Sequence, residues 1–393
     1  MNILLCSWHS VSEPRLKSAL GRFFDKVYVF DKPYNSIDFD TDYIKVLSDY
    51  LVQNPHIDCC ISINFIPIIA KVCNIHHIPY FSWTYDSPSL SLYSDALSYD
   101  TNYAFVIDKA LLERFEKRNP GHIFHLPMCC GIEDCSDIPV SPEEKEKFSC
   151  DISFVGSLYT EKCEFRYDAV SKQLPPYVNG YMDGLISAQS NVYGYNLFKD
   201  SLDKDIAEEY FSYTGLAIPP EYNIDIQEIV ADFYLGYKCS AMDRINTLRA
   251  IGEKYQLSVY TNSDFSVLNY PTAVPHIKNC GTIGYNSEMP KVFKCSKINL
   301  NITTRTNQTG IPSRIFDIMA AGGFVISNYQ SEIPEFFVPE EDIVLYDSIP
   351  DLLHKIDYYL SHEEEREAIA KNGHKKVKAY HTYDNRIMDM FCE

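Results

Sequence analysis

The chain has 393 residues, of which 46% are hydrophobic, and its 35 Lys and Arg against 54 Asp and Glu give a formal net charge of −19. This length exceeds one ordinary core and suits two domains of about 150 to 200 residues each. The acidic balance disfavours nucleic acid and anionic lipid as partners, so an anionic ligand would need a local pocket of backbone amides and basic side chains.

The N-terminal segment and the cysteines predict the cellular compartment of the protein. MNILLCSWHS lacks a basic start and becomes polar within a few positions, which predicts a first strand and no signal peptide. No run of 18 apolar residues is present, so no membrane-spanning helix is expected. The 13 cysteines are scattered without pairs at zinc spacing, and we expect reduced, buried thiols and no metal site. These features together predict a cytoplasmic protein.

Short apolar runs alternate with helix-like segments in the first third of the chain. A helix-like segment at 13–24 separates the first two runs, and the runs themselves lie at 2–6, 26–30, 58–63, 79–83, 103–107 and 122–127. Fully apolar strands separated by helices are typical of a parallel sheet covered on both faces. We predict a Rossmann-like domain over 1–137.

A polar segment at 138–149, with two prolines and a charge run, is predicted to be a linker. The second domain is predicted over 150–378. It opens with the strand DISFVGS, continues with a mostly helical insertion at about 161–254, and then returns to strands at 257–262, 297–302, 324–328 and 342–346. The fold class predicted for the whole chain is therefore α/β, with two doubly wound domains.

The common nucleotide-binding fingerprints are absent. Neither G-x-G-x-x-G nor G-x-x-x-x-G-K-[ST] occurs, which disfavours a dehydrogenase and an NTPase. Doubly wound sheets still bind ligands in the crevice at the carboxyl ends of their strands. The segment FDTD at 39–42 is a D-x-D only by its letters; it precedes a predicted helix, and we interpret it as the N-cap of that helix.

The segment GIPSRIFDIMAAGG at 310–323 predicts one short helix with a ligand at its start. Pro312 suits the beginning of a helix and the glycine pair 322–323 suits its end. Uncapped amides, a close backbone approach at Gly310 and the planar cation of Arg314 favour a diphosphate. Asp317 is placed to accept hydrogen bonds from ribose hydroxyls. The alternative is a surface ion pair between Arg314 and Asp317.

Residues 291–373, which include KINLNITTRTNQTGIPSRIFDIMAAGGFVISN, resemble the C-terminal half of glycosyltransferases related to the spore-maturation protein CgeB. The resemblance extends to DISFVGSLYTE, YTNSDF and GTIGYNSEMP in the second domain, and more weakly to SWTYDSP, FVIDK and HLPMCCG in the first. Those enzymes have the GT-B fold, in which two Rossmann-like domains face each other across a cleft. The resemblance implies that the last segment, 379–393, forms a helix that returns to the first domain.

The resemblance also implies which residues bind a nucleotide-sugar donor. Asp317 takes the place of the acidic residue that holds the ribose, while Thr309 stands where many relatives have a glutamate. The residues implied for the diphosphate are Gly156, Ser157, Arg305, Gly310, Ile311 and Arg314. The residues implied for the nucleobase are Tyr260, Asn262 and Tyr285. No cofactor and no metal are expected, because fixed amides and arginines can stabilise the leaving diphosphate.

An inverting transfer needs a general base from the first domain to accept the acceptor's proton. Asp86, which follows an apolar strand in WTYDSP, is the best-placed carboxylate, although an Asp before Ser-Pro also suits a turn. Glu13 and His9, in the loop SWHSVSE, are alternatives. Trp8 and Trp83 follow strands in the same way and would either stack on a sugar or lie in the core.

We therefore expect a metal-independent glycosyltransferase that moves a sugar from a nucleotide donor, a UDP-sugar, to a hydroxyl group of a glycan or protein. Two alternatives remain. One is a nucleotide-sugar epimerase of the same fold, which needs no acceptor. The other is a non-catalytic subunit that binds a sugar nucleotide or a glycan, since Thr309 departs from the family pattern.

Overall fold

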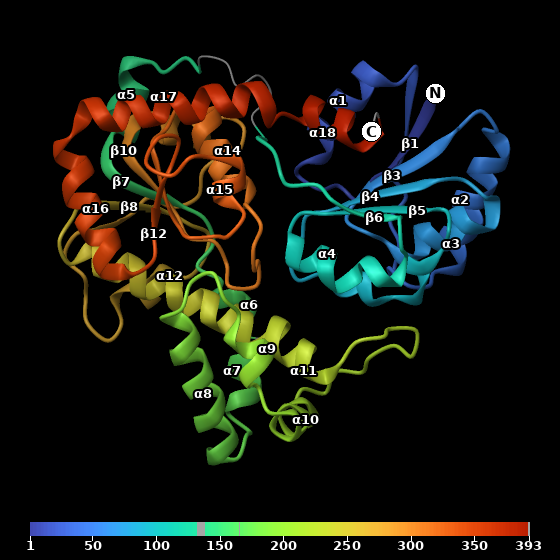
Figure 1. The fold of residues 1–393 in the computed structure, drawn as a ribbon, viewed down its shortest axis with the longest axis horizontal. Helices are drawn as coiled ribbons and strands as arrows, with labels where there is room; N and C mark the ends of the chain where they lie inside the picture. The colour runs from blue at the N-terminus through green and yellow to red at the C-terminus, as the bar shows by residue number, and fades with distance from the viewer. Residues whose placement is uncertain (132–137, 165, 392–393) are drawn as a thin grey trace. The chain divides into compact units, whose positions relative to one another are not determined.

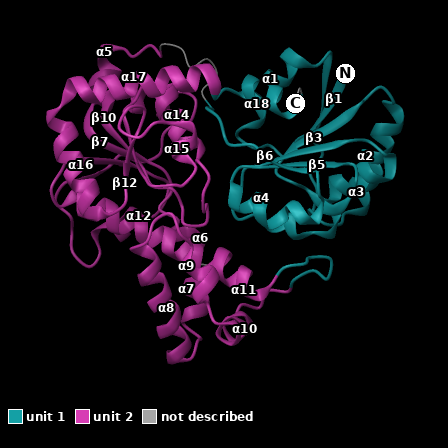
Figure 2. Cartoon of the chain, viewed as in Figure 1, with its two compact units in different colours: residues 1–131, 218–224, 381–393 teal, residues 132–217, 225–380 magenta. Residues whose placement is uncertain are grey.

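The computed structural model describes residues 1–131, 138–164 and 166–391, and Figure 1 shows the fold. The chain divides into two compact units. Unit 1 contains Met1–Gly131, Ile218–Ile224 and the C-terminal segment from His381, and unit 2 contains the other residues (Figure 2). The end of the predicted first domain, 132–137, lies outside the described residues.

Unit 1 is built on a parallel sheet of order β2-β1-β3-β4-β5-β6. Each of the six apolar runs forms a strand, because strands with apolar side chains on both faces are stable where both faces of the sheet are covered. The strands are β1 (Asn2–Cys6), β2 (Lys26–Phe30), β3 (Cys59–Ile63), β4 (Tyr80–Thr84), β5 (Asn102–Val106) and β6 (Ile123–His125). The helices between them are α1 (Glu13–Phe23), α2 (Thr41–Gln53), α3 (Pro67–His76) and α4 (Lys109–Phe115).

Asp40 is the N-cap of α2, as the sequence predicts. Its carboxylate accepts hydrogen bonds from the backbone N–H groups of Asp42 and Tyr43 at 3.0 Å each. Such a cap satisfies two of the N–H groups that have no partner within the helix. The D-x-D letters therefore have a structural role at this position.

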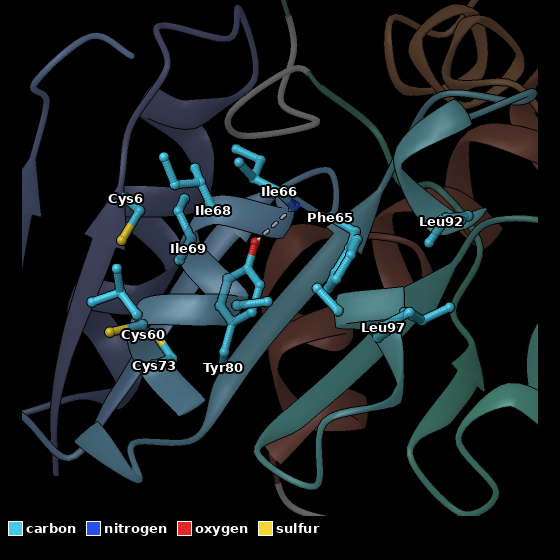
Figure 3. Packing of buried hydrophobic residues seen from close by; sticks show 14 of the residues in the cluster. Cys6, Cys60, Phe65, Ile66, Ile68, Ile69, Cys73, Tyr80, Leu92 and Leu97 are labelled. Atoms are coloured by element: carbon cyan, nitrogen blue, oxygen red, sulfur yellow. Dashed lines mark hydrogen bonds between the residues drawn. The ribbon is translucent and has the colours of Figure 1, made fainter. Parts of the chain in front are cut away.

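The core of unit 1 lies between the sheet and α2 and α3, and it contains the thiols of Cys6, Cys60 and Cys73 (Figure 3). The hydroxyl of Tyr80 is satisfied inside this core, where it accepts a hydrogen bond from the backbone N–H of Ile66 at 3.1 Å. The eleven cysteines in the described ranges are free, and eight of them are buried. Burial raises the pKa of Cys59 to about 12, so this thiol is protonated at neutral pH.

The last helix, α18 (Tyr383–Phe391), packs against α1 in unit 1. Arg22 of α1 forms an ion pair with Asp384. The buried guanidinium of Arg386 donates to the carbonyl oxygens of Pro127 at 2.9 Å and Met128 at 3.1 Å, after β6. The C-terminal segment is thereby part of the first unit.

Unit 2 is built on a second parallel sheet, of order β12-β11-β10-β7-β8-β9. Its strands are β7 (Cys150–Val155), β8 (Leu257–Tyr260), β9 (Ile277–Asn279), β10 (Ser296–Asn301), β11 (Val325–Asn328) and β12 (Val344–Tyr346). Strand β9 was not predicted, because its three residues lie at the sheet edge and none is buried, so they show no apolar run. Helices α13 (Met289–Cys295), α14 (Ser313–Ala320), α15 (Ile333–Phe336), α16 (Ile349–Ser361) and α17 (Glu363–Tyr380) accompany the later strands.

The predicted linker is not an extended connection. Pro142–Phe148 forms helix α5, which begins with a capping box between Ser141 and Glu144. Lys291 of α13 forms an ion pair with Glu144, so α5 belongs to the second unit. Of the features that suggested a linker, Pro142 begins this helix and the charged residues that follow it lie in the helix.

Between β7 and β8 the described chain contains helices and no strand. They are α6 (Thr160–Glu164), α7 (Tyr167–Ser171), α8 (Pro176–Ser190), α9 (Leu197–Ser201), α10 (Lys204–Ser212), α11 (Ile226–Ile229) and α12 (Gly236–Gly252). A π-helical turn at Val230–Leu235 joins α11 to α12. None of the described helices is long and apolar enough to cross a membrane.

Candidate functional site

In the second sheet the order in which strands are added reverses at β7, although all the strands are parallel. The chain continues from β7 to β8 on one side, whereas β10 pairs with β7 on the other side. In parallel sheets the loops on either side of such a point separate and leave a crevice at the carboxyl ends of the strands. Here Gly156 and Ser157 follow β7, and Ile302 and Thr303 follow β10, so the predicted pair Gly156 and Ser157 lies at the crevice.

Arg244, on α12, joins the two loops of this crevice. Its guanidinium donates to the carbonyl oxygen of Ser157 and, from Nε and Nη2, to that of Ile302 at 3.2 and 2.7 Å. The guanidinium carbon lies 4.4 Å from the ring centre of Tyr159. A Cβ atom on Gly156 would lie 3.3 Å from the ring of Phe154 and 3.8 Å from Nη1 of Arg244, so the backbone at this glycine is closely approached by both side chains.

No local pattern marks Arg244, because this residue is separated from Ser157 and Ile302 by long stretches of chain. A second cation lies in its field: burial lowers the pKa of Arg244, Tyr159 and the charge of Asp243 raise it, and the charge of Arg314 lowers it. An anion bound against both guanidinium groups would be attracted by both charges. Such a site favours a phosphate or diphosphate.

Arg314 lies in the first turn of α14, with its side chain 25% exposed. The N-cap of this helix is Pro312, which provides no side-chain cap, and the helix ends before Gly322 with a positive φ of 78°. The start and end of the helix are as predicted. The N–H groups of the first turn have no acceptor within the helix, and the positive end of the helix dipole adds to the field of Arg314.

One of the amides assigned to the diphosphate needs correction. The N–H of Gly310 already donates to Oδ1 of Asn307 at 3.0 Å, whereas the assignment of the Ile311 backbone stays a prediction and its side chain is buried. Thr309 is partly exposed, and its carbonyl oxygen accepts a hydrogen bond from the N–H of Glu332 at 3.2 Å. The loop before α14 is therefore held by hydrogen bonds, and in the first turn of the helix the N–H of Ile315 donates to the carbonyl oxygen of Pro312 at 3.1 Å.

Asp317, which was implied for the ribose, and Tyr285, which was implied for the nucleobase, contact each other. The hydroxyl of Tyr285 donates to Oδ2 of Asp317 at 2.8 Å, and Nη1 of Arg314 lies 3.8 Å from the same oxygen. Asp317 is 0% exposed. Its carboxylate thus orients a tyrosine and an arginine, and a direct contact with ribose stays a prediction that requires Tyr285 to move.

Arg305 does not lie in the crevice, contrary to expectation. Its side chain is only 7% exposed, and Nε lies 3.2 Å from Oδ2 of the buried Asp243. Nη1 donates to the carbonyl oxygen of Val192 at 2.8 Å, and the guanidinium carbon stacks 3.8 Å from the ring centre of Tyr193. This cation is used inside the unit, and Arg244 is the second cation of the crevice.

Replacing Asp243 with Ala should destabilise the protein by about 3 to 5 kcal/mol, because Arg305 would remain buried without its counter-charge. Burial raises the pKa of Asp243, with the charge of Arg305 as the main opposing influence, so the carboxylate depends on this partner. Urea unfolding measures the change. Asp168→Ala removes a half-exposed pair with Lys238 and should cost only about 0 to 1 kcal/mol; equal losses in both variants would contradict the assignment.

Two of the residues predicted to contact the nucleobase lie at the end of β8, and one of them is buried while the other is exposed. Tyr260 is buried and packs with Phe148 and Val292, so it is part of the core. Asn262 is exposed at the turn that follows β8. Its neighbour Ser263 accepts the N–H of Leu158 at 2.8 Å and thereby fixes the β8 loop to the β7 loop.

Lys162, at the start of α6, is a further cation that sequence reasoning missed. Its Nζ lies 4.8 Å from the ring centre of Tyr159 and 5.1 Å from that of Tyr237, and the residue is exposed. Tyr159 has a left-handed backbone with φ of 65°, which a non-glycine residue adopts only where contacts stabilise it. Arg244 and Lys162 thus share one aromatic ring beside the β7 loop.

The carboxyl edge of the first sheet carries the other predicted residues. The indole N–H of Trp8 donates to the carbonyl oxygen of Ile63 at 2.7 Å, which connects the ends of β1 and β3. His9 is exposed and has φ of 65°. Glu13 is buried, and its carboxylate accepts hydrogen bonds from the hydroxyl of Ser7 and from the N–H of Trp8 at 2.9 Å. Glu13 therefore fixes the loop that presents His9, which corrects its assignment as a base.

Asp86 is exposed just after β4, and its carboxylate is oriented by one residue. Nδ2 of Asn64 donates to Oδ2 of Asp86 at 2.7 Å, and Oδ1 of Asn64 accepts the N–H of Tyr85 at 2.8 Å. Trp83, by contrast, is fully buried and donates to the carbonyl oxygen of Leu126 at 3.1 Å, so it is a core residue. Of the three residues predicted as general base, Asp86 has an exposed side chain whose carboxylate is oriented by a hydrogen bond.

No group of three or more His, Cys, Asp or Glu side chains within the described ranges is arranged to hold a metal ion. Residues 244–391 match the family model described as "Glycosyl transferase-like". This match begins at Arg244 and includes α14. No curated protein is significantly similar in sequence to the chain.

Several solved structures are similar to the whole chain. HepE of Anabaena, in complex with UDP and glucose, has a TM-score of 0.58 at 11% identity, covering 100% of this chain and 99% of that chain. Sucrose-phosphate synthase of Thermosynechococcus elongatus has a TM-score of 0.56 at 10% identity, covering 99% and 97%. The lipopolysaccharide outer core galactosyltransferase WaaB has a TM-score of 0.54 at 12% identity, covering 100% and 99%. The two six-stranded parallel sheets with their helices are therefore those of the GT-B fold, which confirms the predicted fold class.

Proposed function

We propose that the protein is a glycosyltransferase that moves a sugar from a nucleoside diphosphate donor to a hydroxyl group of an acceptor. The observation that carries this proposal is the pair of cations, Arg244 and Arg314, with Arg314 in the first turn of α14, a helix that has no side-chain cap. The family match over residues 244–391 supports it, because the matched region contains both arginines.

We propose a uridine diphosphate sugar as the donor. The support is that the similar structure of HepE contains UDP and glucose. The diphosphate would lie against Arg244, Arg314, Lys162 and the first N–H groups of α14, which provide positive charge without a metal. The acceptor would be a glycan or protein hydroxyl, and the residues of 291–373 support a CgeB-like enzyme as the specific type.

In the proposed inverting reaction, the acceptor oxygen attacks C1 of the sugar while the bond from C1 to the diphosphate oxygen breaks. The electron pair of that bond stays on the diphosphate, where Arg244 and Arg314 stabilise the developing charge. The acceptor proton passes to Asp86, which Asn64 orients through the 2.7 Å hydrogen bond. A sugar-transfer product and a free nucleoside diphosphate result.

A thermal-shift series with UDP, GDP, dTDP, CDP and ADP tests the donor site. A ligand that binds only the folded protein at 100 times its Kd adds about 2.7 kcal/mol of stability, and we expect this rise with UDP. Incubation with UDP-sugars and chromatography of the products then distinguish the alternatives. An altered sugar without acceptor indicates an epimerase, and binding without turnover indicates a non-catalytic subunit. If no diphosphate raises the melting temperature, the proposal is wrong.

A further inference from the structure

Seven residues between helices of unit 2 belong to unit 1. The chain leaves unit 2 at Ala217, runs through Ile218–Ile224, and returns to unit 2 at Asp225. Figure 2 draws this segment, which we call the arm, in the colour of unit 1. Because the chain continues from both ends of the arm into α10 and α11, whatever the arm holds in unit 1 is covalently linked to these helices.

The backbone of the arm pairs with the loop that follows β4. The N–H of Asp95 donates to the carbonyl oxygen of Glu221 at 2.8 Å, and the N–H of Asn223 donates to that of Tyr93 at 3.0 Å. Between them, Ser94 and Tyr222 form an antiparallel bridge. These bonds are those of a short antiparallel strand pair, so the arm extends the loop structure of unit 1.

The side chain of Tyr222 anchors the arm in the core of unit 1. It is 6% exposed and belongs to the same buried cluster as Leu92 and Leu97, and Ile218 and Ile224 pack against this cluster. Its hydroxyl donates to Oδ1 of Asp38, in the loop that follows β2. One tyrosine therefore joins a loop after β2 to a loop after β4.

The β2 loop lies at the carboxyl edge of the first sheet, where Asp86 is located, whereas the segment after Asp95 approaches the start of β5, where Nδ2 of Asn102 donates to the carbonyl oxygen of Ala96 at 2.6 Å. Asp86 begins the β4 loop, and the 3-10 turn Leu90–Tyr93 leads from it to the residues that the arm holds. We propose that the arm is a positioning element, with Tyr222 as its anchor, that fixes the β2 and β4 loops and makes the geometry near Asp86 depend on the helices of unit 2. The expected effect of the arm on the acceptor KM rests on the proposed function, whereas its effect on the β2 and β4 loops does not.

Hydrogen exchange followed by mass spectrometry tests the structural part on the full chain. Replacing residues 218–224 with seven Gly and Ser residues should raise exchange at 34–40 and 93–98 by about tenfold or more, since the pairing bonds are lost. Tyr222→Phe keeps the ring and should raise exchange mainly at 34–40. Tyr213→Phe, on an exposed tyrosine before the arm, is the matched control. Wild-type exchange at both loops in the Gly and Ser variant would overturn the proposal.

Steady-state kinetics tests the positioning role. We expect the KM for the acceptor to rise about twofold to tenfold in Tyr222→Phe, while the Kd for UDP stays at the wild-type value, because the donor residues lie in unit 2. Faster exchange together with an unchanged acceptor KM and kcat would overturn the positioning role. If the wild-type protein binds no nucleoside diphosphate, the proposed function fails, and the exchange result still decides whether the arm holds the loops.

Discussion

Replacing Arg244 with Ala should raise the Kd for the nucleoside diphosphate by about 10-fold to 150-fold, which corresponds to about 1.5 to 3 kcal/mol for a lost charge-assisted hydrogen bond. Arg244 bridges the carbonyl oxygens of Ser157 and Ile302, so its loss removes a cation and also loosens the two loops of the crevice. Isothermal titration calorimetry with UDP measures the change. Arg314→Ala should have an effect of the same size.

A matched control lies on the same helix. Arg249 of α12 donates to the carbonyl oxygens of Leu268 and Thr272, away from the crevice. Arg249→Ala therefore removes a comparable set of bonds, and its Kd for UDP should equal that of the wild type. The double variant of Arg244 and Arg314 should lose less than the sum of the single losses, because both cations act on the same diphosphate. Equal affinity in Arg244→Ala and wild type would remove Arg244 from the donor site.

Replacing Asp86 with Asn should lower kcat by about 100-fold to 10,000-fold, the range for a general base, while the Kd for UDP does not change. Asparagine keeps the shape of the side chain but cannot accept the proton of the acceptor hydroxyl. Steady-state turnover with a UDP-sugar and the acceptor measures kcat, and calorimetry measures the Kd. Asn64→Ala should give an intermediate loss, since it removes the group that orients Asp86.

Two further variants separate Asp86 from its alternatives. Asp100→Asn changes an exposed carboxylate before β5, at the opposite end of the strand, and should retain full kcat. His9→Ala tests the other exposed group of the same edge. Full kcat in Asp86→Asn combined with a large loss in His9→Ala would assign the base to His9.

The strands of both sheets were predictable because their signal is local. A run such as Cys59–Ile63 is apolar at every position except Ser62 and is buried at every position. Helix α14 was predictable for the same reason, since Pro312 and Gly322 mark its ends. Strand β9 and helix α5 were missed, because a three-residue edge strand has no apolar run and a charged helix resembles a linker.

The candidate site was less predictable, because exposure and pairing depend on residues far apart in the chain. Arg305 stands in a polar loop and suggests a surface cation, but Asp243 and Tyr193 enclose it. Glu13 follows a strand as a base would, but the β1 loop folds over its carboxylate. Tyr260 ends a strand and suggests a base-stacking residue, but it packs against Val292.

Apolar periodicity was enough to predict two parallel sheets and one short helix at 310–323, and the position of Asp86 after a strand was enough to nominate it as a base. The folded chain was needed to show which arginine contacts the loops after β7 and β10 and that the arm 218–224 belongs to the first unit. The physical reason is that a charge is placed by the acceptors that surround it, and the acceptors of Arg244 and the anchor partner of Tyr222 come from distant parts of the chain.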